Sequence, residues 1–368
     1  MQLNPERQLM SSCCIAMPEK INIQWLKNNT GKLFNTDTLV NERSQMLENI
    51  PVASCNECWN ANDQGVPSRQ IRFNGQEKTD STVISSPKVL EIKLGINCNL
   101  TCSYCDRYSS SSWLNDITTN GLYENNHAEG RFEVTSNDRL VVKLGQKSLA
   151  NSNNYKLLIN EAASYTSINQ VIITGGEPFL FNNLLDIINK FQCQILIFTG
   201  LGVDSKRLVK FLDQLPKDRV RLAVSAENLD KRYEFNRYGN TYASFLKNVE
   251  SINNSGIIFD FYSVVSNVTI FGLKDFLNKF QNLLGSNICV SPEYLAPYVI
   301  DPISREQILS TDYNKWTNEI HETVKKIPTE AIRMQAGKFI TEFAKRRNLS
   351  LDIIFPSNFI DWLNTPEK

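Results

Sequence analysis

Three cysteines in one short segment are the residues of this chain best suited to chemistry. Cys98, Cys102 and Cys105 lie in the run Cys-Asn-Leu-Thr-Cys-Ser-Tyr-Cys, at spacings of four and then three positions. Soft thiolates gathered on one loop are typical ligands of an iron–sulfur cluster. Three thiolates on a four-iron cluster leave one iron open to bind another molecule. The alternatives are a chance grouping, or a zinc loop whose fourth ligand no nearby Cys or His supplies.

A second candidate segment is the run Gly175-Gly176-Glu177-Pro178, which directly follows the apolar residues 170–174. Because glycine has no side chain, a ligand can approach the main chain closely and hydrogen-bond to it. Taken alone, this run is typical of a turn. Its place after the strand that follows the cysteine segment favours a ligand-binding role.

The segments that position both runs alternate between predicted strands and helices. Residues 88–95 alternate apolar and charged side chains, which predicts a strand that leads directly into the cysteines. The other predicted strands are residues 170–174, 194–199, 219–225, 257–265 and 287–291, and the predicted helices are residues 147–164, 182–191, 205–215, 242–255 and 272–284. Such alternation predicts an α/β fold with parallel strands joined by helices. Six strands fall short of the eight of a closed barrel.

The flanking segments differ from this alternating region. Residues 1–85 are polar, with one helical pattern at residues 39–47. A polar insertion at residues 109–137 is predicted to be a loop with little regular structure. From residue 304 onward the pattern predicts helices. We therefore divide the chain into an N-terminal cysteine-containing segment (1–85), a central strand-and-helix domain (86–295) and a C-terminal helical segment (296–368).

Composition excludes several function classes. The 368 residues include 39 basic and 39 acidic side chains, so no charge excess favours a nucleic acid or a membrane surface as partner. No apolar stretch reaches the length of a membrane span, and the N-terminus lacks a signal-peptide pattern. We therefore expect a cytoplasmic protein. In a reducing cytosol its nine cysteines are thiols or metal ligands, not disulfides.

Together, the Cys-x3-Cys-x2-Cys run, the tyrosine before its last cysteine and the Gly-Gly-Glu-Pro run resemble the radical S-adenosylmethionine (SAM) superfamily. The resemblance implies a partial, TIM-like (β/α)6 barrel with a [4Fe–4S] cluster on the three cysteines. It also implies that the amino and carboxylate groups of SAM bind the open iron. The resemblance places these residues near SAM: Gly175, Gly176 and Glu177 at the amino end, Tyr104 at the adenine, Ser225 and Glu227 at the ribose or carboxylate, and Arg237 and Asn267 where relatives often contact SAM. The alternative interpretation of Arg237 is a solvated helix residue.

The resemblance also implies a mechanism. One electron passes from the cluster to the sulfonium of SAM, which breaks into methionine and a 5′-deoxyadenosyl radical. That radical abstracts hydrogen from the substrate in a site that excludes water. A flavodoxin or ferredoxin is the expected electron donor. Cys289, on the last predicted strand, could donate hydrogen to a substrate radical, although packing in the core is the favoured interpretation, as it is for Cys193.

Four further cysteines form a second candidate metal site. Cys13 and Cys14 are adjacent, and Cys55 and Cys58 form a Cys-x2-Cys pair followed by Trp59. This layout resembles radical SAM proteins with a twitch or SPASM-like segment, in which such cysteines bind an auxiliary [4Fe–4S] cluster. The fuller pattern has a further upstream cysteine that this chain lacks, so both adjacent cysteines would have to ligate or one iron would stay open. A structural zinc ion, or no metal at all, is the alternative.

The leading functional hypothesis is a maturase for a ribosomally made peptide. Auxiliary-cluster relatives often do such work, and the missing strands leave the barrel mouth wide enough for a chain, which could also add along an exposed strand edge. The chemistry could be cross-linking, epimerisation or backbone splicing, and a small partner protein could deliver the peptide. The alternatives are an enzyme acting on a small molecule, such as a sugar, nucleotide or cofactor precursor, and a non-catalytic iron–sulfur scaffold.

Overall fold

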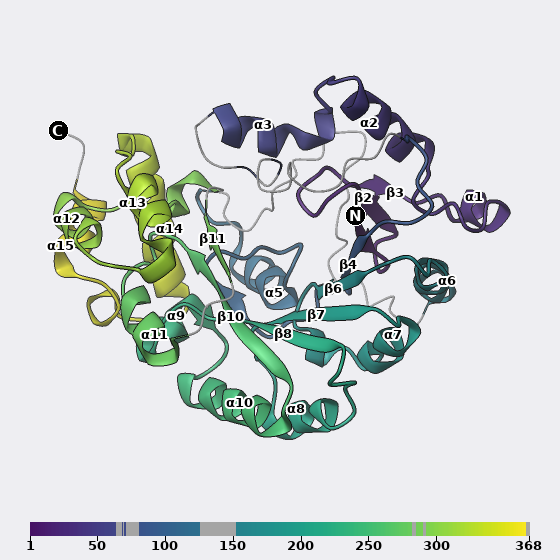
Figure 1. The fold of residues 1–368 in the computed structure, drawn as a ribbon. Helices are drawn as coiled ribbons and strands as arrows, with labels where there is room; N and C mark the ends of the chain where they lie inside the picture. The colour runs from purple at the N-terminus through teal and green to yellow at the C-terminus, as the bar shows by residue number, and fades with distance from the viewer. Residues whose placement is uncertain are drawn as a thin grey trace. The chain divides into compact units, whose positions relative to one another are not determined.

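Parallel strands form the framework of the fold, as the alternating pattern predicts. The computed structural model describes residues 1–63, 68, 70, 81–125, 152–281, 285–289 and 292–365. The chain divides into two compact units: unit 1 is Met1–Gly95, Lys147–Ile197 and Leu215–Arg221, and unit 2 is Ile96–Gln146, Phe198–Gln214 and Leu222–Lys368. Strands occur at all six predicted places (Figure 1), so the predicted α/β class is confirmed. The last strand lies at 285–288 instead of the predicted 287–291. Residues 290–291 of that prediction, and residues 282–284 of the predicted helix 272–284, lie outside the described residues. The three-part division at residues 85 and 295 stays a prediction.

The first three predicted strands pair in parallel in unit 1. They are β4 (Val89–Lys93), β6 (Gln170–Thr174) and β7 (Gln194–Thr199), which lie in this order in the sheet. Alternate side chains of these strands are buried, namely Leu90, Ile92, Val171, Ile173, Ile195 and Ile197. The period of two that predicted the strand at residues 88–95 is therefore its burial pattern, and the two more apolar strands bury alternate residues in the same way.

Three short N-terminal strands were not predicted. β1 (Gln2–Asn4) pairs in parallel with β4, and β2 (Leu9–Ser11) and β3 (Glu19–Lys20) extend the sheet in antiparallel fashion. Strands of two or three residues are too short to show an alternating pattern, and they form because β1 finds a partner in β4. The edge of β4 is therefore covered by the chain itself, and a peptide substrate has no place to add there.

The other predicted strands lie in unit 2 or enter it. β8 (Val220–Ser225), β10 (Ile258–Val265) and β11 (Gly285–Ile288) are neighbours in that order, and β10 pairs with β11 in parallel. A separate two-stranded ladder, also not predicted, joins β5 (Thr101–Cys102) to β9 (Arg237–Tyr238) in antiparallel fashion. This ladder brings the cysteine segment to a residue far along the sequence.

Helices cover the strands and make up the end of the chain. In unit 1 they are α1 (Ile23–Asn28), α2 (Asp37–Leu47), α3 (Asn56–Asp63), α6 (Asn153–Ala163) and α7 (Leu184–Lys190). In unit 2 they are α5 (Ser111–Asn120), α8 (Ser205–Leu212), α9 (Asp230–Asn236), α10 (Tyr242–Ser255), α11 (Leu273–Phe280), α12 (Pro302–Leu309), α13 (Thr317–Val324), α14 (Glu330–Arg346) and α15 (Ser357–Asn364). Short 3-10 turns occur at Ala53–Cys55, Pro178–Leu180, Glu293–Leu295, Asn314–Trp316 and Leu351–Ile353. The predicted C-terminal helices are confirmed, and no helix in the described part of the chain is long and apolar enough to cross a membrane.

Local sequence sets the ends of these helices, as α10 illustrates. The Thr241 hydroxyl accepts a hydrogen bond from the backbone N–H of Ser244 at 3.1 Å, which caps the helix start. Gly256 ends the helix with φ of 75°, a left-handed conformation that glycine adopts at little cost. Between these caps Phe245, Val249 and Ile252 form the buried face.

Helix α5 corrects the prediction that residues 109–137 form a loop. The hydroxyl of Ser110 accepts a hydrogen bond from the backbone N–H of Trp113 at 3.3 Å, which caps the helix start. Trp113 and Ile117, four positions apart, form its buried face. The run of serines suggested a loop, but here a serine serves as the cap. Residues 126–137 of this prediction, and residues 147–151 of the next predicted helix, lie outside the described residues.

We expect Trp113→Ala to lower the free energy of unfolding by about 3–5 kcal/mol, because it removes a fully buried ring from the core. That ring packs against Tyr123 and Phe343, at centroid distances of 5.5 Å and 5.8 Å. Chemical denaturation measures the change. The control is Thr118→Ala on the exposed face of α5, with an expected change of no more than about 0.5 kcal/mol. Similar losses in both variants would contradict the burial of Trp113.

Candidate functional site

The start of α5 holds the first cysteine of the triplet. The Ser111 hydroxyl accepts a hydrogen bond from the backbone N–H of Cys98 at 3.0 Å and donates one to its carbonyl at 2.9 Å. The Ser112 hydroxyl donates to the same carbonyl at 2.9 Å. The backbone N–H of Leu100 donates to the Cys98 sulfur at 3.4 Å. The serine run that resembled a flexible loop therefore fixes the backbone of Cys98.

The second cysteine is held by the ladder between β5 and β9. Cys102 lies opposite Arg237 in the register, and its carbonyl accepts hydrogen bonds from Trp113 Nε1 at 2.9 Å and from the backbone N–H of Cys105 at 3.0 Å. The Arg237 guanidinium Nη1 lies 3.9 Å from the Cys102 sulfur, to which it donates a long hydrogen bond. Cys102 is buried, while Cys98 and Cys105 are partly exposed.

A buried ion pair lies beside Cys102. Arg237 Nη2 is 2.6 Å from Glu227 Oε1, and Arg237 Nε donates to Glu227 Oε2 at 3.1 Å. The Tyr104 hydroxyl donates to Glu227 Oε1 at 2.7 Å. Burial alone would lower the pKa of Arg237, but Glu227, Tyr104 and Cys102 raise that pKa well above its ordinary value, so the guanidinium stays charged. Burial, opposed by Arg237, raises the pKa of Tyr104, so its hydroxyl stays a donor.

A network of buried polar side chains ties the cysteine loop to the ends of two strands. The Ser103 hydroxyl donates to Asn236 Oδ1 at 2.9 Å, and Asn236 Nδ2 donates to Asn228 Oδ1 at 2.7 Å. Asn228 Nδ2 then donates to the carbonyls of Thr269 and Phe271, each at 2.8 Å. The sequence does not predict a role for Ser103, Asn228 and Asn236, since only the folded chain brings them together. No local pattern distinguishes these three residues from other polar residues of the chain.

The three thiols are a set that a metal cluster fits. Burial first, and then the charges of Asp106, Cys102 and Cys98, raise the pKa of the Cys105 thiol well above its usual value. Mutually repelling thiolates of this kind need a cationic partner, which iron supplies. In the part of the chain that the structure describes, no three His, Cys, Asp or Glu side chains converge on a single ion. A four-iron cluster binds each thiolate through a different iron, so its ligands lie further apart than those of one ion.

The Gly-Gly-Glu-Pro run follows β6 in unit 1, as predicted. Gly175 and Gly176 have φ of 89° and 49°, in the left-handed region that favours glycine. A Cβ atom on Gly175 would lie 2.7 Å from Lys93 Cγ and 2.8 Å from the Gly95 carbonyl oxygen, so no other residue fits there. Glu177 is buried, and its carboxylate accepts a hydrogen bond from the backbone N–H of Phe179 at 3.3 Å.

The remaining predicted SAM contacts lie in unit 2. Ser225 is the partly exposed last residue of β8. Asn267 is fully buried, and its Nδ2 donates to the Tyr294 carbonyl at 2.7 Å. Its Oδ1 has no hydrogen-bond partner among the described residues. A buried acceptor of this kind is costly unless a ligand supplies the donor.

Three of the four N-terminal cysteines lie close together in unit 1. Burial, followed by the charges of Cys13, Glu42 and Cys58, raises the pKa of Cys55 to about 11, although a hydrogen bond with Ser54 opposes the rise. Cys58 is buried, and Cys13, Cys14 and Cys55 are partly exposed. Glu42, which no sequence pattern marks, accepts a hydrogen bond from the Ser54 hydroxyl at 2.5 Å. Metal binding here stays a prediction.

Comparison with known proteins supplies the family. The family model described as the radical SAM superfamily matches residues 92–280, just over half of the chain. No curated protein matches the chain significantly.

Similar solved structures include native anSMEcpe with bound AdoMet (16% identity, 72% of this chain and 62% of that chain, TM-score 0.37). Others are Streptococcus suis SuiB bound to precursor peptide SuiA (15%, 81% and 60%, 0.37) and TYW1 with a lysine–pyruvate adduct bound (14%, 78% and 83%, 0.32). The chain therefore spans about three fifths of the length of the first two.

We expect Gly175→Ala to destabilise the fold by at least about 1 kcal/mol more than Gly256→Ala. Both glycines have positive φ, so both variants carry the same kind of backbone strain. Only at Gly175 does the new methyl group also collide with neighbouring atoms, because nothing lies within 4 Å of a Cβ on Gly256. Chemical denaturation of the two variants measures the difference. Equal losses would show that the chain has room for a side chain at Gly175.

Proposed function

The chain belongs to the radical SAM superfamily of enzymes, and from this premise we propose that it cleaves SAM reductively and abstracts hydrogen from a peptide substrate. Cys98, Cys102 and Cys105 would hold a [4Fe–4S] cluster. When bound, this cluster supplies the electron that breaks a carbon–sulfur bond of SAM and so releases a 5′-deoxyadenosyl radical.

One observation carries the proposal: three thiols are held on a loop whose backbone is fixed from several sides. Ser111 and Ser112 hold Cys98, the ladder with Arg237 holds Cys102, and the turn from Cys102 holds Cys105. A loop restrained in this way keeps its thiols in place before any metal binds. Such preorganisation suits a cluster site and has no evident use in a chance grouping of cysteines.

Each unit by itself offers candidate contacts for SAM. The left-handed backbone at Gly175 and Gly176 leaves main-chain groups open to the amino end of SAM. Asn267 Oδ1 is a buried acceptor without a partner among the described residues, which supports a donor from SAM there. Tyr104 and Glu227 hydrogen-bond to each other, so binding of the adenine or ribose would act on that pair. Ser225, partly exposed at the end of β8, would be a further contact.

The N-terminal cysteines support the peptide substrate. Cys13 and Cys58 lie close enough to Cys55 for their charges to raise its pKa, which supports an auxiliary cluster with Cys14 as the fourth cysteine. Radical SAM proteins whose N-terminal cysteines resemble these often modify peptides. A flavodoxin or ferredoxin would supply electrons, and a small partner protein could deliver the peptide.

Iron counting tests both clusters. After anaerobic reconstitution we expect about eight irons per chain in the wild type, and about four both in a Cys98/Cys102/Cys105→Ala variant and in a Cys55/Cys58→Ala variant. Only the first variant should lose formation of 5′-deoxyadenosine from SAM and dithionite. Cys193→Ala is the control, because Cys193 belongs to neither group.

Three results would contradict parts of this proposal. Formation of 5′-deoxyadenosine by the triple variant would remove the catalytic cluster from Cys98, Cys102 and Cys105. About four irons in the wild type, with none in the triple variant, would remove the auxiliary cluster. Zinc lost from the Cys55/Cys58→Ala variant would identify the second site as structural zinc.

The substrate class is tested with deuterium. Enzyme reconstituted with its clusters, unlabelled SAM and reductant are mixed with an extract of cells that express this protein and were grown in heavy water. We expect deuterium in the 5′-deoxyadenosine, because its radical takes hydrogen from the substrate. Treating the extract with a protease beforehand should abolish the label if the substrate is a peptide. Label that survives proteolysis and passes a small-pore filter would identify a small-molecule substrate and overturn the peptide proposal.

A further inference from the structure

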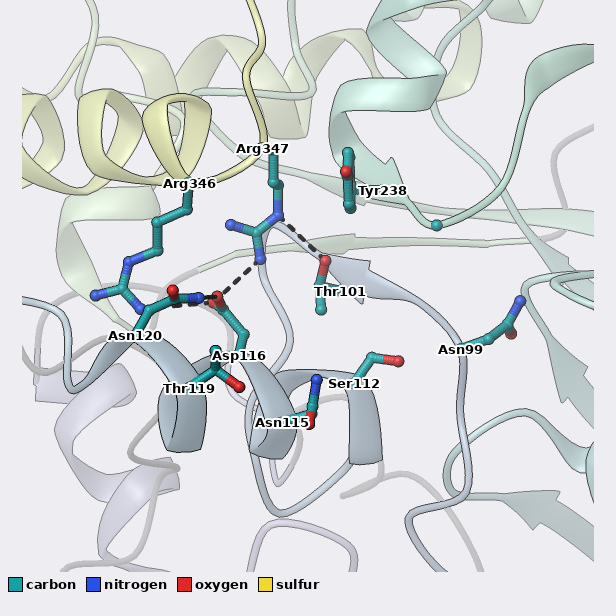
Figure 2. A pocket seen from close by; sticks show the side chains of 11 residues that line it. Asn99, Thr101, Ser112, Asn115, Asp116, Thr119, Asn120, Tyr238, Arg346 and Arg347 are labelled. Atoms are coloured by element: carbon teal, nitrogen blue, oxygen red, sulfur yellow. Dashed lines mark hydrogen bonds and ion pairs between the residues drawn. The ribbon is translucent and has the colours of Figure 1, made fainter.

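The ladder between β5 and β9 has two faces, because neighbouring residues of a strand point to opposite sides. Cys102 and Arg237 are paired, and the Arg237 guanidinium reaches the Cys102 sulfur. Thr101 and Tyr238 are the next pair, and both line a pocket of about 260 Å³ on the reverse face. In Figure 2 the side chains of Thr101 and Tyr238 lie beside Arg347 in that pocket.

Arg237 divides its donors between two partners. Nε and Nη2 donate to the two oxygens of Glu227, and Nη1 donates to the sulfur of Cys102. Arg237 is 4% exposed and Glu227 is 1% exposed, so solvent screens this charge distribution little. The bidentate pair fixes the plane of the guanidinium, and the remaining N–H group is thereby aimed at the sulfur.

We propose that Arg237 is a positioning residue that raises the reduction potential of the cluster by donating a hydrogen bond to the sulfur of Cys102. The inference rests on the proposed function, since it requires the cluster on Cys98, Cys102 and Cys105. Reduction adds one electron from a one-electron donor, and no bond forms or breaks. A cationic donor on a ligand sulfur stabilises the more negative, reduced state, and hydrogen bonds to the sulfurs are a recognised determinant of cluster potential.

Glu227 acts in the opposite sense through the same contact. Its carboxylate orients Arg237 but also offsets the positive charge of the guanidinium. Removing Arg237 therefore leaves a buried negative charge near the cluster, whereas neutralising Glu227 leaves the positive charge uncompensated. The two substitutions should shift the potential in opposite directions. A purely structural role of the pair predicts no such opposition.

The experiment is a redox titration of the reconstituted protein, followed by electron paramagnetic resonance before SAM is added. Arg237→Gln should lower the one-electron reduction equilibrium constant at least about tenfold, a fall of about 59 mV in potential. Arg237→Lys keeps the charge and should recover part of that fall. Glu227→Gln should raise the potential.

Arg347→Gln is the matched control. Arg347 is also a buried arginine paired with a carboxylate, with Nη2 3.3 Å from Asp116, and its Nε donates to Thr101 Oγ1 at 3.2 Å on the reverse face of the ladder. Its loss should change the equilibrium constant less than about threefold, because it contacts no cluster ligand.

Two outcomes would overturn the inference while leaving the proposed function standing. One is a fully loaded Arg237→Gln protein whose potential equals that of the wild type. The other is a fall in potential for both Glu227→Gln and Arg237→Gln. A wild-type protein that binds no iron would overturn the proposed function, and this inference with it.

Discussion

The site depends on the buried ion pair between Arg237 and Glu227. Transferring two charges out of water is costly, and the cost is offset only where geometry is good and other groups share the bonds. Here the pair is bidentate and Tyr104 adds a third hydrogen bond to Glu227. Removing one partner of such a pair costs about 3–5 kcal/mol, because the other charge stays buried alone. The pair joins β9, the strand that pairs with the cysteine segment, to the residues just after β8.

The cysteine loop has no regular structure beyond two residues of strand, so contacts with other segments of the chain must hold its shape. Three supports supply it: the serines at the start of α5, the ladder to Arg237, and the amide network through Ser103, Asn236 and Asn228. All three use polar groups at buried or half-buried positions, where an unmade hydrogen bond is costly. Each support therefore favours one arrangement of the loop over its alternatives, which is what a preformed ligand set requires.

In unit 1, too, short segments take their structure from partners elsewhere in the chain. The three-residue strand β1 is too short to be stable alone, but it forms along β4 and closes that edge of the sheet. The same unit brings Cys13 close to Cys55 and Cys58. The composition of residues 1–85 indicates little more than a polar segment. The folded chain nevertheless uses these residues to cover a strand edge and to bring thiols together.

The sequence by itself determined the α/β class, the six strands, the cysteine triplet and the glycine run, because each of these follows from local patterns. Apolar residues at alternate positions indicate a strand, and closely spaced cysteines indicate a set of metal ligands, without reference to the rest of the chain. Only the tertiary structure decided that Ser110 begins a helix, that β1 pairs with β4, and that Arg237 faces Glu227 and Cys102. These outcomes depend on partners far apart in the chain: Arg237 lies 135 positions after Cys102. The type of a residue determines which bonds it can make, but only the folded chain determines which residues are its partners.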